Sequence, residues 1–248
     1  MLNLFKLFSK KSDSKIYEQE AVAEIPPPII FGENNTIIYK DNNNEIQINN
    51  FNYQDYLIGI NLHIIGNNNT IIIDSSASFK NSSIKIDYSN NGTLKIEGNS
   101  ELNNLEIIAD LADNFFISFG RDNKVQGGLS IICIEHNSGF ISGNECLYSH
   151  GIKAISGDGH TILDHSSGQI LNRPEHYITI GDHCWIGERV LLTKNTQISD
   201  NSIVAMGSIV TKNFLEENII IGGNPAKIIK ENIDWHSCRI SDYIREFQ

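Results

Sequence analysis

The segment from Ile180 to Leu215 reads IGDHCW, IGERVL, LTKNTQ, ISDNSI, VAMGSI and VTKNFL, which are six consecutive groups of six residues. The first place of each group holds a branched apolar residue, and the fifth place mostly holds a small or β-branched one. The first places are Ile180, Ile186, Leu192, Ile198, Val204 and Val210, and the fifth places include Cys184, Val190, Thr196, Ser202 and Ser208. Neither the helical period of 3.6 nor the strand period of two repeats in this way. The pattern predicts a repeat whose structural unit is six residues long.

A six-residue unit fits one flat side of a triangular coil with three sides per turn. The aliphatic first residue then fills the interior, and the small fifth residue lies at a tight corner. From about residue 29, short Ile-rich runs alternate with Asn- and Gly-rich turns, without helical segments between them. Upstream of the six groups the spacing persists only in fragments, such as Ile96 to Leu102. We expect irregular coils of the same all-β solenoid there, and a separate β-sandwich is the alternative.

The sequence resembles the hexapeptide-repeat acyltransferases, whose fold is a left-handed parallel β-helix, and the match is close from about Phe140 to Trp235. The handedness follows from the resemblance alone, because β crossovers are usually right-handed. We divide the chain into a tail over 1–28, a β-helix domain over 29–227 and a cap over 228–248. Apolar residues from Ile228 to Ile244 roughly suit an amphipathic helix. A solenoid end also needs a cap with a polar outer face, so we expect a short helical cap.

The six-residue register breaks over the interval 156–177, which is polar and rich in Gly, Ser and Asn. A loop that protrudes from a rigid scaffold is a common place for functional residues. This one holds His160, His165 and His176, with Asp158 and Asp164 near the first. An imidazole can take a proton from a hydroxyl near neutral pH, and a carboxylate on its other nitrogen fixes the tautomer. Either aspartate could be that partner of His160.

The stretches SGDGHTILD (156–164) and ILNRPEHYITIGDHCWIG (170–187) resemble one subgroup of the family. That subgroup acetylates sugar hydroxyls of capsular polysaccharides, lipopolysaccharides and sialic acids. The resemblance implies that His160 is the catalytic base and that Trp185 lines the pocket for the acetyl group and the acceptor. Asp158 also matches the motif, and we assign it to orienting His160. The structural alternatives are a surface histidine at 160 and a packing role for the tryptophan.

The segments VAMGSIVTK (204–212) and GGNPAKIIK (222–230) match the family's acetyl-CoA contacts. Small side chains let an extended pantetheine arm approach the backbone, and lysines can meet phosphates as point charges. The residues assigned to acetyl-CoA are Ala205, Gly207, Ser208, Lys212, Asn224, Pro225 and Lys227. The sequence departs from the family pattern at Met206, where a small residue is usual, and in NFLEEN (213–218), where a proline often occurs. The resemblance further implies direct acetyl transfer without a metal, in homotrimers with active sites between subunits.

Composition excludes some partners and leaves others open. A formal charge of −11 and a pI of about 5.1, with no basic stripe, argue against nucleic-acid binding. Four widely spaced cysteines fit free thiols in a reducing compartment. The N-terminal apolar residues are too few to span a bilayer. They form either a frayed tail or a small surface helix that contacts the inner membrane face, so we expect a cytoplasmic protein with or without that peripheral contact.

The function that these patterns favour is O-acetylation of a surface glycan from acetyl-CoA. One alternative is N-acetylation of an amino sugar on a nucleotide, because the base chemistry is similar. A second is a non-catalytic solenoid that binds glycans along its Asn-rich coils. A third is a zinc enzyme of the carbonic anhydrase type, which needs about three converging histidines, and the histidines here show no such spacing on coil faces.

Overall fold

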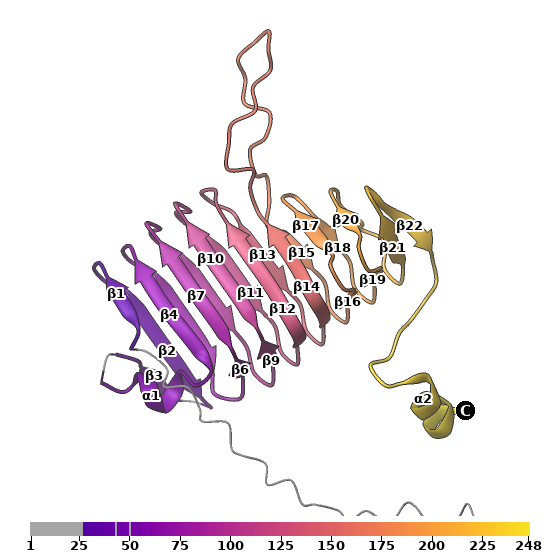
Figure 1. Ribbon diagram of the computed structural model, residues 1–248, viewed down its shortest axis with the longest axis horizontal. Helices are drawn as coiled ribbons and strands as arrows, with labels where there is room; N and C mark the ends of the chain where they lie inside the picture. The colour runs from indigo at the N-terminus through magenta and orange to yellow at the C-terminus, as the bar shows by residue number, and fades with distance from the viewer. Residues whose placement is uncertain (1–26, 43, 50) are drawn as a thin grey trace, which may run out of the picture.

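The computed structural model describes residues 27–42, 44–49 and 51–248. Apart from its last two residues, the predicted tail over 1–28 lies outside this part of the chain, and so does the proposed surface helix. The described chain forms a parallel β-helix, in which strands from successive coils lie side by side along one long stack (Figure 1). The strand pairs between successive coils are parallel, which excludes a separate β-sandwich in the first half.

The strands line up in three faces. The first face holds β1 (Ile29–Phe31), β4 (Ile60–Ile65), β7 (Ser82–Asp87), β10 (Leu105–Asp110), β17 (Leu191–Thr193) and β20 (Ile209–Val210). The second holds β2 (Thr36–Asp41), β5 (Thr70–Asp74), β8 (Thr93–Ile96), β11 (Phe116–Phe119), β13 (Gly139–Ser142), β15 (Ile178–Ile180) and β18 (Gln197–Ile198). The third holds β6 (Ser78–Lys80), β9 (Glu101–Asn103), β16 (Trp185–Ile186), β19 (Ile203–Val204) and β21 (Ile220–Gly223). Two long strands, β12 (Lys124–Cys133) and β14 (Leu147–Ile155), run across the third and first faces.

The six-residue register is confirmed in the C-terminal coils. All six first-place residues from Ile180 to Val210 are buried, with at most 2% of their surface exposed. Successive coils there are 18 residues apart, as the hydrogen bond from the Asp182 amide to Asp200 Oδ1 shows, so three units make one turn. The fourth place of the first five units takes a positive φ, from His183 through Gly207. The chain therefore turns at that place, and the small fifth residue is buried inside the corner.

The upstream coils are longer than the C-terminal ones and vary in length. Side-chain bonds between equivalent residues, such as Asn68 to Asn91, join positions 23 residues apart. Each of these turns carries strands of up to six residues on the first face, which lengthens the coil beyond three six-residue units. The expected irregular coils are confirmed, because paired residues on the first face are 34 apart between β1 and β4, 22 apart between β4 and β7 and 24 apart between β10 and β12. The first coil also carries an insertion with β3 (Asn44–Gln47), antiparallel to β2, and α1 (Tyr53–Tyr56).

Asparagine at the corners explains the Asn-rich composition. At one corner, several coils have an asparagine with φ between 57° and 60°. These residues are Asn34, Asn68, Asn91, Asn114, Asn137 and Asn195. Asparagine enters this left-handed region more readily than other residues with a Cβ. The amide of Asn114 also donates to Asn137 Oδ1 of the next coil at 3.1 Å. Each such asparagine makes a corner, and bonds of this kind link neighbouring corners.

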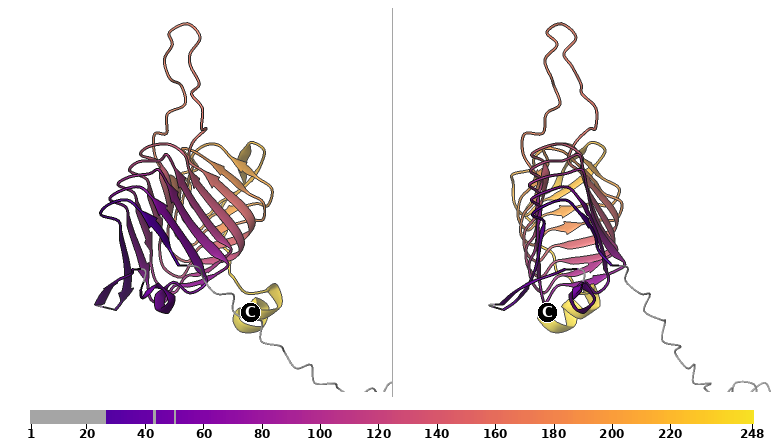
Figure 2. Two further views of the ribbon diagram at one scale, coloured as in Figure 1. Left: turned by 60° about the vertical axis from the view of Figure 1, so that its left-hand side comes forward. Right: turned by 90° about the vertical axis from the view of Figure 1, so that its left-hand side faces the viewer.

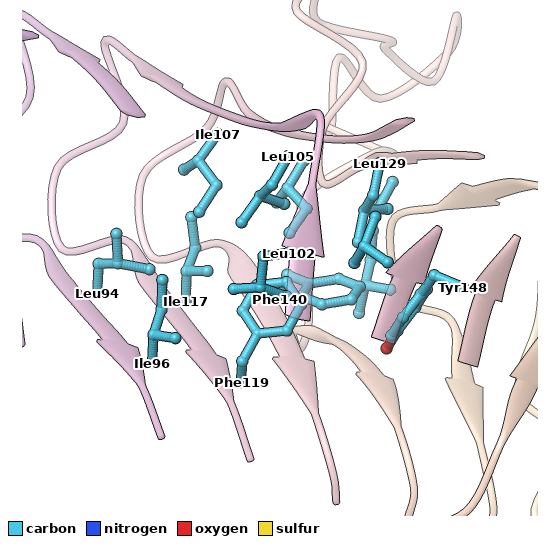
Figure 3. Close-up of a cluster of buried hydrophobic side chains, with 14 of the residues drawn as sticks. Leu94, Ile96, Leu102, Leu105, Ile107, Ile117, Phe119, Leu129, Phe140 and Tyr148 are labelled. Carbon is cyan, nitrogen blue, oxygen red and sulfur yellow. The ribbon is translucent and has the colours of Figure 1, made fainter. Parts of the chain in front are cut away.

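The interior of the stack is apolar and holds three large aromatic rings where the long coils meet the short ones. Phe119 and Phe140 have ring centroids 5.6 Å apart, and Tyr148 lies 6.4 Å from each (Figure 3). The buried Tyr148 hydroxyl donates to Ser142 Oγ at 2.7 Å. A few buried polar side chains form hydrogen bonds with backbone groups at the corners, and Asn123 forms several of them. It donates to the carbonyls of Gly120 and Gly143 and accepts from the Cys146 amide, so a buried polar group is fully used.

The C-terminal segment differs in part from the predicted cap. Residues 226–230 form β22 (Ala226–Lys230), antiparallel to β21, because the turn through Gly223 folds the chain back on the last coil. Helix α2 (Ile240–Phe247) begins only at residue 240 and buries none of its residues. The strand β22 therefore forms the end of the sheet, while α2 lies beside the lower edge of the stack (Figure 1).

Candidate active site

A long arm leaves the coils at the predicted break in register. Strand β14 ends at residue 155 and β15 begins at residue 178, and the segment between them stands away from the stack (Figures 1 and 2). Its two limbs pair at Leu163 and Ile170, and the Leu171 amide donates to the Ile162 carbonyl at 2.8 Å. The large apolar side chains of this hairpin are between 41% and 62% exposed. The arm thus holds its own shape without burying its apolar residues on this chain.

The base of the arm is held by Asn172. Its Nδ2 donates to Asp158 Oδ2 at 2.7 Å and to the His160 carbonyl at 2.8 Å, and its Oδ1 accepts from the Ile162 amide at 2.9 Å. Lys194, on the coil that follows the arm, forms an ion pair with Asp158. The Lys194 ammonium, followed by the Asn172 amide, lowers the pKa of the Asp158 carboxyl below its usual range. These contacts tie the backbone of His160 to the rigid coils.

The two aspartates near His160 both form contacts that hold the arm in its conformation. Asp158 binds Asn172 and Lys194 rather than the imidazole of His160. Asp164 lies at the tip, where Oδ1 accepts from the amides and hydroxyls of Ser166 and Ser167. These four hydrogen bonds hold the pKa of the Asp164 carboxyl well below its usual range. Asp158 is therefore linked to His160 through Asn172, and Asp164 forms the turn at the tip.

The imidazole of His160 is exposed, and within the described residues its ring makes no hydrogen bond or ion pair. His165 is exposed at the tip. His176 lies at the other end of the arm, where its Nε2 faces Asn213 Nδ2 at 3.4 Å. An exposed imidazole on a fixed backbone can accept a proton from a group brought to it from outside this chain.

Trp185 begins β16 on the third face and is 38% exposed. Its Nε1 donates to Ser149 Oγ at 3.1 Å, so the ring lies along the preceding coil. Trp235, from the segment after β22, lies beside it with ring centroids 6.0 Å apart. Sequence reasoning placed Trp235 in the cap and missed this pairing, as it missed Asn172 and Lys194. Nothing in the spacing of these three residues signals their contacts, which depend on the path of the folded chain.

The structure separates His160 from Trp185 within one chain. Trp185 pairs with Leu147 at the start of β14, whereas the arm begins after Ile155 at its end. The path along the nine residues of β14 is on the order of 25 Å at about 3.3 Å per residue, and it bends at Gly151, with a φ of 67°, from the third face to the first. The arm then extends further from the edge of the stack opposite to β16 (Figure 1). One chain alone does not bring these two residues together.

Part of the predicted acetyl-CoA set gathers at one place. Ser208 Oγ donates to the Ala205 carbonyl at 2.6 Å and accepts from the Gly223 amide at 3.2 Å. Asn224 and Pro225 follow in the turn between β21 and β22, joined by a cis peptide bond, and Lys227 pairs with Gly222 across it. Gly207 has a φ of 70°, and no heavy atom lies within 4 Å of where a Cβ would be. This leaves an open strip with small side chains beside an exposed lysine.

Lys212 lies apart from that strip. Its Nζ is 5.1 Å from the centroid of the Phe214 ring, beyond the end of β20, whereas Ala205 to Ser208 turn the chain before β20. Met206 is 73% exposed, so the departure from the family pattern at this place adds a large side chain to the surface of the strip. The structure thus brings six of the seven predicted residues into one region and leaves Lys212 on another side of the coil.

Two kinds of feature are absent from the described residues. They contain no group of three or more His, Cys, Asp or Glu side chains placed to hold a metal ion. They also contain no helix whose length and apolar character would let it cross a membrane.

Comparison with known proteins gives the family. No protein-family profile matches the chain. A polysialic acid O-acetyltransferase of Neisseria meningitidis is 31% identical over 174 residues, covering 70% of this chain and 78% of that protein. A polysialic acid O-acetyltransferase of Escherichia coli O1:K1 / APEC is 30% identical over 142 residues, covering 57% of this chain and 44% of that protein.

Two solved structures share the fold. The polySia-specific acetyltransferase NeuO superposes with a TM-score of 0.73 at 24% identity, covering 88% of this chain and 92% of that one. The polysialic acid O-acetyltransferase OatWY gives a TM-score of 0.62 at 25% identity, covering 88% and 98%. The expected fold class, a left-handed parallel β-helix with a protruding loop, is confirmed. The chain is an enzyme and belongs to the hexapeptide-repeat acetyltransferases, in the subgroup that resembles the capsular polysaccharide and sialic acid O-acetyltransferases.

Proposed function

We propose that the chain transfers the acetyl group of acetyl-CoA to a hydroxyl of a sugar in a surface glycan, with a sialic acid residue as the preferred acceptor. The acceptor class comes from relatives whose printed names specify polysialic acid, and the similarity to one of them extends over 70% of this chain. The observation that carries the proposal is the arm, which presents the exposed His160 on a backbone fixed by Asn172.

His160 acts as the general base in this proposal. Its imidazole takes the proton of the sugar hydroxyl as the oxygen attacks the acetyl carbonyl, and it later returns a proton to the departing thiolate. Asp158 positions the base indirectly, through the Asn172 amide that holds the His160 carbonyl. Trp185 forms one wall of the acceptor pocket. No covalent acyl-enzyme is required, because the hydroxyl attacks directly.

Acetyl-CoA supplies the activated acetyl group as a thioester. The strip around Gly207 fits its extended arm, because the absence of a side chain leaves open space beside the backbone. Ala205, Ser208, Asn224 and Pro225 border the strip, and in this proposal Lys227 binds a phosphate. Lys212 would need a different part of the cofactor or a neighbouring chain.

The separation of His160 and Trp185 supports a site shared between subunits. If the arm of one chain reaches the third face of another, the base and the pocket wall meet without any change within a chain. The exposed apolar side chains of the arm gain a partner in the same arrangement. We therefore propose a homotrimer. We also place the enzyme in the cytoplasm, with its N-terminal tail as the part that would contact the inner membrane face.

The test is acetyl transfer from isotope-labelled acetyl-CoA to a panel of sialic acid monosaccharide, sialic acid oligomers, neutral sugars and nucleotide-linked amino sugars. We expect ester-linked label on the sialic acids and a loss of at least about 100-fold in kcat for His160→Ala. Label on an amino group would contradict the O-acetyltransferase assignment. Normal turnover of His160→Ala would remove His160 as the base.

A further inference from the structure

The wall beside Trp185 is built by the segment after β22. That segment runs back across the coils, where the Ile233 amide donates to the Asn218 carbonyl at 3.0 Å and Asn218 Nδ2 donates to the Ile233 carbonyl at 3.0 Å. The path places Trp235 over the corner made by His183. The indole and the imidazole stack with centroids 4.5 Å apart and planes 12° apart.

Trp235 is fixed by two polar contacts as well as by stacking. Its Nε1 donates to the His183 carbonyl at 2.8 Å. Its own carbonyl lies 3.1 Å from His183 Nε2, and because a carbonyl oxygen only accepts, this imidazole nitrogen carries the proton. The side chain of Trp235 is therefore ordered before any ligand arrives, which lowers the entropy cost of binding.

Trp185 and Trp235 together present a continuous aromatic surface. Their planes are inclined by 40° with centroids 6.0 Å apart, so the two rings form a shallow angle rather than a closed stack. A groove of about 510 Å³ continues from Trp235 along α2. Asp234, His236 and Tyr243 line it among apolar side chains. The groove thus joins aromatic faces to a few hydrogen-bonding groups.

These features suit a sugar ring. The C–H bonds on one face of a pyranose carry partial positive charge and pack against the negative face of an aromatic ring. The Asp234 carboxylate can accept from sugar hydroxyls, and the His236 imidazole can donate or accept. A polymeric acceptor extends beyond the residue that reacts, so it needs contacts outside the pocket that Trp185 lines. The groove is continuous with that pocket wall through Trp235.

We propose that Trp235 is the stacking wall of a second acceptor subsite, which holds the sugar residue adjacent to the one acetylated. The ligand class of this subsite rests on the proposed function. Trp235 is a specificity-determining residue in this account, because it contacts the neighbouring sugar and leaves the reacting atoms to His160 and Trp185.

The kinetic test compares a sialic acid monosaccharide with a sialic acid tetrasaccharide as acceptors. For Trp235→Ala we expect kcat/KM to fall about tenfold with the tetrasaccharide and to stay within about twofold with the monosaccharide. The KM for acetyl-CoA should not change. Trp235→Phe keeps an aromatic face and should restore most of the preference for the longer acceptor. Phe51→Ala, which removes a side chain that is 98% exposed near α1, is the matched control and should change neither acceptor.

Equal losses with both acceptors, or no loss with either, would overturn the subsite. A binding measurement separates this result from the proposed function. Saturation-transfer NMR with the tetrasaccharide, without acetyl-CoA, should show contact in the unaltered chain and in His160→Ala, and a much weaker signal in Trp235→Ala. Binding without any turnover would contradict the proposed function and keep the subsite. A signal that is absent from the unaltered chain, or unchanged in Trp235→Ala, would contradict the subsite itself.

Discussion

The arm base offers a test of how the fold positions its catalytic group, through the substitution Asn172→Ala. The change removes hydrogen bonds to Asp158 and to the His160 carbonyl, and the one that Asn172 accepts from the Ile162 amide. Each such bond contributes about 0.5–1.5 kcal/mol net, and their partial exposure puts the sum near the lower end. We take about 2 kcal/mol, which is about a 30-fold shift in the equilibrium between the ordered and the disordered arm base.

The effect on turnover depends on how well ordered the arm base is at the start. We expect kcat to fall between about threefold and 15-fold. The larger loss applies if the ordered base is only just favoured, and the smaller one if it is favoured roughly tenfold. The melting temperature should stay nearly unchanged, because the arm lies outside the core of the coils. Ser167→Ala is the control, since it removes the hydroxyl bonds of Ser167 to Asp164 Oδ1 and from the Gln169 amide at the tip of the same arm and leaves the base intact.

The assay combines steady-state kinetics with hydrogen exchange of the Ile162 amide. Asn172→Ala should speed exchange of this amide and lower kcat together, whereas Ser167→Ala should leave both unchanged. If Ile162 exchanges faster while kcat stays at its original value, order at the base does not position His160, and the reasoning is refuted.

Four other predictions follow from the coils and the arm. His160→Gln should lower kcat by about 10²–10⁴-fold with an unchanged melting temperature, and a smaller loss would argue against general-base catalysis. Asn123→Ala should lower the free energy of unfolding in urea by about 3 kcal/mol, because it leaves the buried Cys146 amide without an acceptor and removes one of the two donors to each of the Gly120 and Gly143 carbonyls; a loss below about 1 kcal/mol would contradict this. Asn114→Ala should lower it by about 1 kcal/mol while Asn114→Gly costs less, since the corner has a φ of 57°, and the reverse order would contradict the corner assignment. The pKa values of Asp158 and Asp164 lie below 3.8, so these carboxylates stabilise the arm fully above that pH and lose this effect as the pH falls through the lowered values. The amides of the arm should therefore stay protected from hydrogen exchange between neutral pH and about 4, and a loss of protection between pH 7 and 5 would contradict this.

The C-terminal coils could be predicted residue by residue because each six-residue unit needs the same residue types at the same places. A branched side chain such as Ile186 must fill the interior, and a small one such as Ser202 must fit inside a corner. The upstream coils repeat the same pattern of interior and corner residues at a spacing of about 23, which is not a multiple of six, so the six-residue pattern is present there only in fragments. Asn68 and Asn91 repeat at that longer spacing and were visible in the sequence only as part of a general excess of asparagine.

Site residues that lie in short sequence motifs could be predicted, whereas contacts that depend on the path of the folded chain could not. His160 and Trp185 lie in short motifs, and the break in register marks the arm. The partners of Asp158 are 14 and 36 residues away, at Asn172 and Lys194, so the pattern around His160 suggested a contact with the imidazole instead. Trp235 meets Trp185 only because the chain turns back after β22.

The central claim is that His160 and Trp185 of different chains form one acetyl-transfer site. The most direct measurement mixes two variants that each lack one half of the site, His160→Ala and Trp185→Ala, by unfolding and refolding them together in equal amounts. In a shared site, a Trp185→Ala chain supplies the histidine and a His160→Ala chain supplies the tryptophan. Random assembly then restores about a quarter of the original activity, because each of the two roles is filled by the suitable chain half of the time. Refolded mixtures with no more activity than the separate variants would contradict the claim.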